Sequence, residues 1–188
     1  MTHASHGTGL AERPRDVFFV VCFAVFAFSS CFSDTLHALG RLQGEGFWAD
    51  AHRWYAEVAG DRFFEANHLF LRISTGISGL VFGPFYLLLI YAFVTGANWI
   101  RIPALVYVGA MAHGMVEFLY WEYWLVGPRP EHGSVFLAFN LPYLVVPLLL
   151  ALRMWREPPF GDGPPQEHPR AGAEHDDRPS IRRRSRRR

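Results

Sequence analysis

The 188-residue chain contains no lysine, and all 18 of its basic residues are arginine. This bias, together with abundant alanine, glycine and proline, favours a GC-rich bacterial source. About 10 of the 18 arginines follow Leu152, so the body of the chain is nearly neutral to acidic and the tail is basic.

Cysteine is also scarce, with Cys22 and Cys31 the two present. On one predicted helix their spacing corresponds to about 13 Å of rise, which excludes a disulfide between them. No dinucleotide-binding pattern, phosphate loop or metal-ligand cluster occurs, and the single "HGMVE" lacks the second histidine of a zinc-protease motif. We therefore expect neither a cofactor nor a metal.

Charge is missing from long stretches of a chain that is 51% hydrophobic and 16% aromatic. A transmembrane helix needs about 20 mainly apolar residues, and four segments meet this requirement. We predict an all-α, four-helix membrane bundle. A cleaved signal peptide is an alternative for the first segment, but its length favours a retained span. The predicted spans are 17–39, 69–95, 101–126 and 134–154.

The arginines indicate how these spans are oriented. Arg13 and Arg15 precede the first span, Arg101 lies between the second and third, and Arg153 and Arg156 follow the fourth. Since cytoplasmic loops are enriched in arginine, both termini should be cytoplasmic. We expect a multi-pass protein of the bacterial plasma membrane, or of the endoplasmic reticulum if the source is eukaryotic.

Outside the spans the chain divides into a short cytoplasmic segment (1–14), the membrane domain (15–157) and a tail (158–188). Within the loop after span one, residues 47–61 have the spacing of an amphipathic helix, which we place on the extracytoplasmic side. The tail is rich in proline and predicted to be disordered. Its "RRRSRRR" end is expected to contact anionic lipid headgroups rather than nucleic acid.

Ionisable residues inside spans are rare and usually face a bundle interior or a cavity. His113 and Glu117 are four residues apart on one helix face, and we predict that they line a functional cavity. Glu122 lies half a turn from His113 and serves another surface or the helix end. Alternatively, Asp34 and Glu122 could lie at the ends of their spans, where they would face water at the membrane surface. Asn140 is typical of a helix–helix hydrogen bond.

The second span contains three glycines, Gly76, Gly79 and Gly83, and the last of them directly precedes Pro84. Small residues allow helices to approach closely, and a proline bends a helix. We therefore expect a kinked helix in close contact with a neighbour.

Five short sequence motifs occur in a recognisable order: "FSDTLHAL", "WYAEVAGD", "GPFYLLLIYAF", "WIRIPALVY" and "NLPYLVVP". In these motifs the chain resembles EXPERA-domain proteins, the family of emopamil-binding protein (the sterol Δ8–Δ7 isomerase) and the sigma-2 receptor. It is most similar to the sigma-2 branch, from roughly Phe18 to Phe160. The resemblance implies an intramembrane cavity that holds a sterol-like lipid or a hydrophobic amine.

The resemblance also implies ligand-binding roles for individual positions. Asp34 matches the acidic residue that ends the family's first span, and Asp61 matches the aspartate after "WYA". Glu122 matches the glutamate that closes the isomerase's third span. Asn140 and Tyr143 match an Asn-x-x-aromatic element, with tyrosine in place of tryptophan.

Two family positions have lost their acid–base groups. The span-two glutamate is absent from "RISTGISG", where the candidates are Thr75, Gly76 and Ser78, and the isomerase's first-span histidine is replaced by Ser30. His113 and Glu117 are not expected from the family pattern, so they could rebuild an acid–base pair from span three.

Three hypotheses follow, of which the first is that the protein binds an apolar lipid within its bundle. The second is an isomerase in which Glu117 and His113 exchange protons while Asp34 or Glu122 stabilises a cation. The third is a structural or chaperone-like membrane partner. We also consider a homodimer.

Overall fold

The computed structural model describes residues 10–42, 44–61, 64, 68–125 and 129–160. Within these residues the elements are all helical, and no strand occurs. The predicted disordered tail lies outside the described residues from residue 161 onward.

Four helical segments are long and apolar enough to cross a membrane: Pro14–Ala38, Leu69–Thr95, Asn98–Leu125 and Gly133–Met154. They confirm the predicted all-α fold with four spans. The largest differences from the predicted boundaries are three residues, at Pro14 and at Asn98.

Each span is assembled from shorter elements, several of them joined by π-helical turns. Span one contains α1 (Pro14–Phe28), η2 (Ser29–Asp34) and α2 (Thr35–Ala38). Span two contains α5 (Leu69–Ile77), η3 (Ser78–Phe82) and α6 (Gly83–Thr95). Span three contains η4 (Asn98–Ile100), α7 (Arg101–Tyr120) and η5 (Trp121–Leu125). Span four contains α8 (Gly133–Asn140) and α9 (Pro142–Met154).

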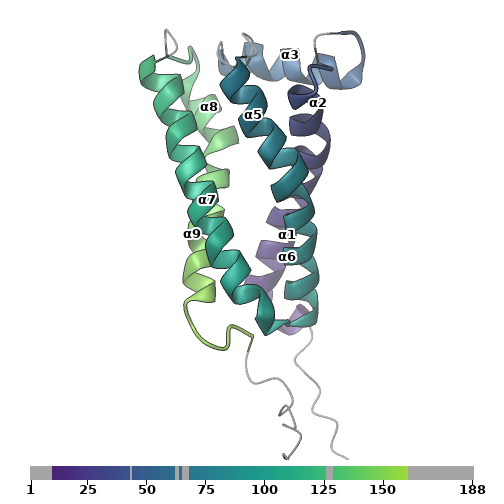
Figure 1. The fold of residues 1–188 in the computed structure, drawn as a ribbon, viewed down its shortest axis with the longest axis vertical. Coiled ribbons are helices and arrows are strands. Elements are labelled where there is room, and N and C mark those ends of the chain that lie inside the picture. Colours follow the sequence, from purple (N-terminus) through teal and green to yellow (C-terminus); the bar gives the residue numbers. More distant parts are fainter. Residues whose placement is uncertain (1–9, 43, 62–63, 65–67, 126–128, 161–188) are drawn as a thin grey trace, which may run out of the picture.

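The helix predicted for 47–61 is present as α3 (Phe47–Ala59). It lies across one end of the bundle, which we call the α3 end, while the first and last described segments meet at the opposite, terminal end (Figure 1). The first and last segments that the structure describes thus lie at the same end of the bundle, and the compartment that this end faces stays a prediction. Gly60 stops α3 in a left-handed conformation with a φ of 66°, where a Cβ would meet the Glu131 nitrogen at 2.7 Å.

The core of the bundle is aromatic. Phe19 and Phe23, four residues apart on α1, lie against Phe93 of α6 with ring centroids 5.3 and 5.9 Å away. Tyr107 of α7 donates a hydrogen bond to the hydroxyl of Tyr86 at 3.2 Å, so the one polar atom of each ring is satisfied. α1 packs mainly on α6, and α7 mainly on α9.

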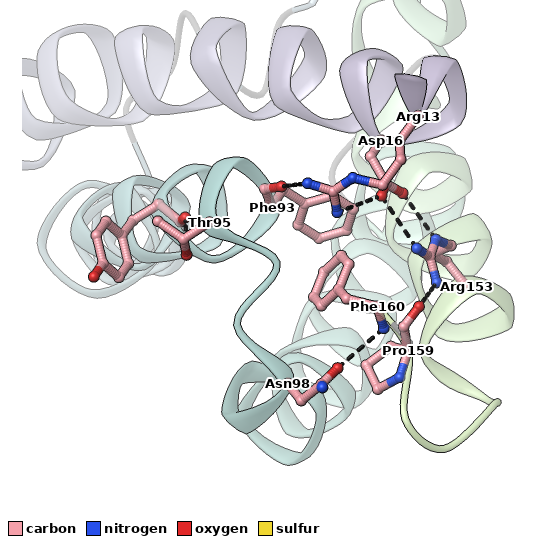
Figure 2. Close-up of polar contacts among 9 residues, drawn as sticks. Arg13, Asp16, Phe93, Thr95, Asn98, Arg153, Pro159 and Phe160 are labelled. Carbon is pink, nitrogen blue, oxygen red and sulfur yellow. Dashed lines mark hydrogen bonds and ion pairs between the residues drawn. The ribbon is translucent and has the colours of Figure 1, made fainter. Parts of the chain in front are cut away.

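The terminal end is closed by ion pairs around Asp16, which is 1% exposed. Arg153 donates to both Asp16 oxygens, at 2.8 and 3.1 Å, and Arg13 donates to one of them at 3.0 Å (Figure 2). Both guanidinium groups lie over the ring of Phe160, whose backbone nitrogen donates to the side chain of Asn98 at 3.0 Å. These contacts tie the start of span one to the end of span four.

Candidate functional site

Three of the four spans contain a π-helical turn, and each turn carries a polar side chain of interest. η2 holds Ser30 and Asp34, η3 holds Ser78, and η5 holds Glu122. π-Helical turns are rare and occur frequently at functional sites, because the extra residue re-aims the side chains around it. These turns set the positions of two polar clusters.

The first cluster surrounds Asp34, where span one meets span two. The hydroxyls of Ser30 and Ser78 are 3.0 Å apart, and the Asp34 carboxylate hydrogen-bonds with both side chains. The two turns touch so closely that a Cβ on Gly79 would lie 2.2 Å from the Thr35 hydroxyl. The close approach expected from the glycines of span two is therefore present, and Gly79 is the residue that permits it.

The contact between Ser30 and Ser78 joins two of the positions at which the sequence differs from the family pattern that it otherwise resembles. By the resemblance given above, Ser30 is expected at the position of the isomerase's histidine, and Ser78 is one of the candidates for the span-two glutamate. Tyr143 of span four interacts electrostatically with Asp34, and its hydroxyl lies 2.7 Å from that of Ser29. Asp34 is thus surrounded by hydroxyl groups.

His37, three residues after Asp34, was not among the predicted site residues. Its Nδ1 lies 3.1 Å from the hydroxyl of Thr75, which itself donates to the carbonyl of Leu71 at 2.9 Å. If Thr75 gives its single hydroxyl proton to the Leu71 carbonyl, Nδ1 of the neutral ring donates to Thr75 and Nε2 is an acceptor. The residue is 4% exposed, and Nε2 has no hydrogen-bond partner among the described residues. Sequence spacing from Asp34 was the only signal for it.

A second imidazole, His52 of α3, lies beside His37. The ring of Phe64 stacks on both, with centroids 4.5 Å from His37 and 4.8 Å from His52. The Nε2 of His52 is 2.6 Å from the hydroxyl of Ser33. Burial, and secondarily the neighbouring His37, lower the pKa of His52 to about 4, so this part of the α3 end holds a neutral imidazole.

The second cluster joins α3 to α8 around Asp61. Tyr55 donates to Asp61 at 3.0 Å, the backbone nitrogen of Phe64 donates to its other oxygen at 2.8 Å, and Asn140 donates to the Tyr55 hydroxyl at 2.9 Å. Burial raises the pKa of Asp61, and the bonds from Phe64 and Tyr55 oppose this shift. Asn140 forms the helix–helix hydrogen bond that its position predicted.

Glu122 belongs to the surroundings of this second cluster. It is 3% exposed and interacts electrostatically with Asp61 and Tyr55. Its Oε2 has no hydrogen-bond partner among the described residues. A buried polar atom without a partner is uncommon in a folded protein and calls for a specific explanation, such as a bound ligand or a functional role.

The comparison with known families agrees with this architecture. EXPERA (EXPanded EBP superfamily) matches residues 47–154, more than half of the chain. The chain belongs to the EXPERA family. The matched region runs from α3 to α9, so it contains Asp61 and Glu122, whereas Asp34 and His37 precede it.

His113 and Glu117 of this EXPERA protein lie elsewhere. Their side chains are 74% and 50% exposed on the outer face of α7, with Nδ1 and Oε2 3.6 Å apart. Glu122 is buried on the opposite side, as its spacing from His113 predicted. The structure therefore brings together Asp34 with Tyr143 and Asp61 with Glu122 and Asn140, but it does not place His113 or Glu117 near either set.

No group of three His, Cys, Asp or Glu residues that could hold a metal ion occurs in the part of the chain that the structure describes. An open, apolar hollow of about 570 Å³ lies between Phe18 of α1 and span four, where Leu141 and Val145 are among its lining residues. This hollow faces outward, and neither Asp34 nor Glu122 lines it.

Proposed function

We propose that this EXPERA protein binds a sterol-like lipid, or another apolar molecule with one polar group, inside the α3 half of its bundle. The observation that carries the proposal is the pair of buried polar atoms, Nε2 of His37 and Oε2 of Glu122, that have no partner among the described residues. Leaving such an atom unpaired costs about 1–3 kcal/mol, and a ligand that supplies the missing bond recovers it.

The chemistry of these groups suggests which polar group the ligand carries. An unpaired carboxylate oxygen accepts a hydrogen bond from an ammonium or a hydroxyl, and the His37 acceptor favours a hydroxyl. The surroundings of His37 are aromatic, since the ring of Phe64 stacks on it with centroids 4.5 Å apart. An apolar body with a single alcohol or amine matches both features.

The test is identification of co-purified lipid by mass spectrometry after gentle extraction in native lipid discs. We expect an apolar lipid with one hydroxyl or amine, retained at near-stoichiometric amounts by the wild type and lost in Glu122→Gln and His37→Phe. Glu57→Gln on the exposed face of α3 is the matched control and should retain the lipid. If the wild type releases no such lipid, the proposal fails and a structural or chaperone-like role is favoured.

An isomerase is the second candidate, because Asp34 and Glu122 provide two separate interior carboxyl groups. In that reaction a protonated carboxyl transfers its proton to one alkene carbon of the lipid, which becomes a carbocation. A carboxylate then removes a proton from a neighbouring carbon, and the double bond has moved with no net change in atoms or electrons. The sequence-based assignment of this proton exchange to Glu117 and His113 stays a prediction.

The two candidates differ in a measurable product. An isomerase incubated in D₂O with a Δ8-unsaturated sterol forms an isomer that carries solvent deuterium, and Asp34→Asn abolishes its formation while the protein still folds. A binding protein retains the sterol unchanged. Glu117→Gln distinguishes the outer pair from the interior carboxylates, because it should leave both results unaltered if the interior groups act.

A further inference from the structure

The arginines at the terminal end of the bundle differ in how many of their donors are used. Arg13 and Arg153 are bonded to the buried Asp16. By contrast, Arg156 is exposed and makes no hydrogen bond or ion pair within the described residues. Arg101 uses its Nε and Nη1, and its Nη2 has no partner in the same part of the chain. Two guanidinium groups therefore keep N–H donors for another molecule.

Contacts between spans three and four bring these two arginines to one place. Nε of Arg101 donates to the carbonyl of Met154 at 3.1 Å, so the start of α7 touches the end of α9. Nη1 of Arg101 lies 3.1 Å from Oε2 of Glu157. The backbone nitrogen of Phe160 donates to the side chain of Asn98 at 3.0 Å, as Figure 2 shows. The short loop after α9 is thus held at both ends beside the start of span three.

Two exposed tryptophans accompany the two arginines. Trp99 stands two residues before Arg101 and is 54% exposed, and Trp155 directly precedes Arg156 and is 78% exposed. They lie at the start of span three and just after the end of span four. Exposed indoles at span ends prefer the level of the lipid headgroups. We call this group of residues the α7–α9 corner: Trp99, Arg101, Trp155 and Arg156.

An acidic side chain of the protein itself already contacts this corner. The carboxylate of Glu157 is paired with Arg101, but the Glu157 side chain is 75% exposed while that of Arg101 is 25% exposed. Ion pairs of such exposure contribute little to stability, so another anion can replace the carboxylate at low cost. The position of Glu157 therefore marks where an anion meets the guanidinium group of Arg101.

We propose that the α7–α9 corner binds an anionic phospholipid of the bilayer, with the phosphate between Arg101 and Arg156 and the acyl chains beside the two indoles. A guanidinium group offers several N–H donors in one plane, which suits the oxygens of a phosphate. Basic residues clustered between membrane helices are a known type of site for anionic headgroups.

The tryptophans are the reason for choosing a lipid as the occupant. A free phosphate ion would use the arginines alone, whereas a phospholipid also covers the exposed indoles with its glycerol and acyl groups. The corner lies on the outer surface of the end opposite to α3 (Figure 1), so the proposal does not depend on the proposed interior ligand. It concerns the folded part of the chain and is separate from the expected lipid contact of the arginine-rich tail.

Quenching of tryptophan fluorescence by brominated lipids tests the site in reconstituted vesicles. The 188-residue protein is placed in phosphatidylcholine vesicles that contain either acyl-brominated phosphatidylglycerol or acyl-brominated phosphatidylcholine. The signal of the corner is the difference between a protein and its Trp99→Phe/Trp155→Phe derivative. We expect brominated phosphatidylglycerol to quench this signal at lower mole fractions than brominated phosphatidylcholine. Equal quenching by the two lipids would overturn the proposal.

Single substitutions separate the corner from the general positive charge of this end. Arg156→Gln should lower the preference for phosphatidylglycerol about fivefold, the factor expected for one arginine near anionic lipid. Glu157→Gln should raise the preference, because it removes the carboxylate that competes for Arg101. Arg15→Gln is the matched control, since Arg15 is an exposed arginine of α1 at the same end, and it should leave the preference unchanged. An equal loss in Arg15→Gln, or no loss in Arg156→Gln, excludes the corner as the site.

Discussion

The two ends of the bundle treat buried polar groups in opposite ways. At the terminal end, Asp16 receives three hydrogen bonds from two arginines. Both terminal nitrogens of Arg13 are also bonded, and its Nε is the one atom of this group without a partner among the described residues. At the α3 end, by contrast, the sole free nitrogen of His37 and one oxygen of Glu122 are unpaired among the described residues. Polar groups whose hydrogen bonds are all made within the protein stabilise one architecture, whereas an unpaired polar atom can still form a hydrogen bond with a ligand. The interior of the terminal end is therefore structural and the α3 end is the place to look for an interior ligand.

The largest expected effect comes from breaking the terminal end. Asp16→Ala leaves two partly buried arginines, 16% and 23% exposed, without their anion and should cost up to about 3 kcal/mol of unfolding free energy. The measurement is unfolding in mixed micelles followed by circular dichroism. Asp50→Ala is the control, because Asp50 and its partner Arg53 are more than half exposed and such pairs contribute about 0–1 kcal/mol. Similar losses for the two variants would contradict the assignment of the terminal end as structural.

A second variant tests whether the α3 end depends on the contact between η2 and η3. Gly79→Ala forces η3 away from Thr35 and Ser30 of span one and should cost about 1–3 kcal/mol, with loss of bound lipid. Gly109→Ala, where the added methyl group meets open space, should instead stabilise the protein by up to about 1 kcal/mol through helix propensity. Thermal unfolding and lipid retention measured on both variants separate overpacking from the general effect of replacing a glycine.

Much of the fold could be predicted because it depends on local patterns. Uninterrupted apolar runs determine where the spans lie, and the spacing of Trp48, Tyr55 and Val58 determines the face of α3. The terminal end could not be predicted, because Asp16 and Arg153 are 137 residues apart and no pattern pairs them. Each alone resembles an ordinary charge at a span boundary.

The site was only partly predictable for a different physical reason. In a membrane, both the lipid-facing and the bundle-facing side of a helix are apolar, so periodicity shows that His113 and Glu117 share a face but not which way it turns. The contact between His37 and Thr75 depends on how spans one and two pack, and the π-helical turns at η2 and η3 shift the phase of the residues that follow. No single-sequence pattern reports such turns.

A third variant should raise the stability of the protein while abolishing lipid binding, whereas Asp16→Ala at the terminal end should lower stability. Glu122→Met replaces an unpaired buried carboxyl with an apolar side chain of similar length and should stabilise the lipid-free protein by about 1 kcal/mol or more. Lipid retention should be lost. Glu57→Met on the exposed face of α3 should change neither quantity, and a loss of stability in Glu122→Met would show that Glu122 is structural.

The smallest expected effect is a pH dependence confined to the α3 end. The pKa of His52 is lowered from 6.5 to about 4, so the folded state favours the neutral ring and the unfolded state binds more protons between these values. Stability from this group is therefore present above pH 6.5 and is lost as the pH falls toward 4. The groups that face it are His37, Ser33 and Phe64, with Arg72 beyond His37, and the partial exposure of the ring keeps the effect modest. The protection factors of α3 amides, corrected for the slower intrinsic exchange at low pH, should fall on acidification from pH 7 to pH 5 in the wild type. This fall should be smaller in His52→Gln, which can keep a bond to Ser33 without titrating. Amides of α1 near Asp16 report on the terminal end, and an equal fall in their protection factors would show that the response is global rather than local to α3.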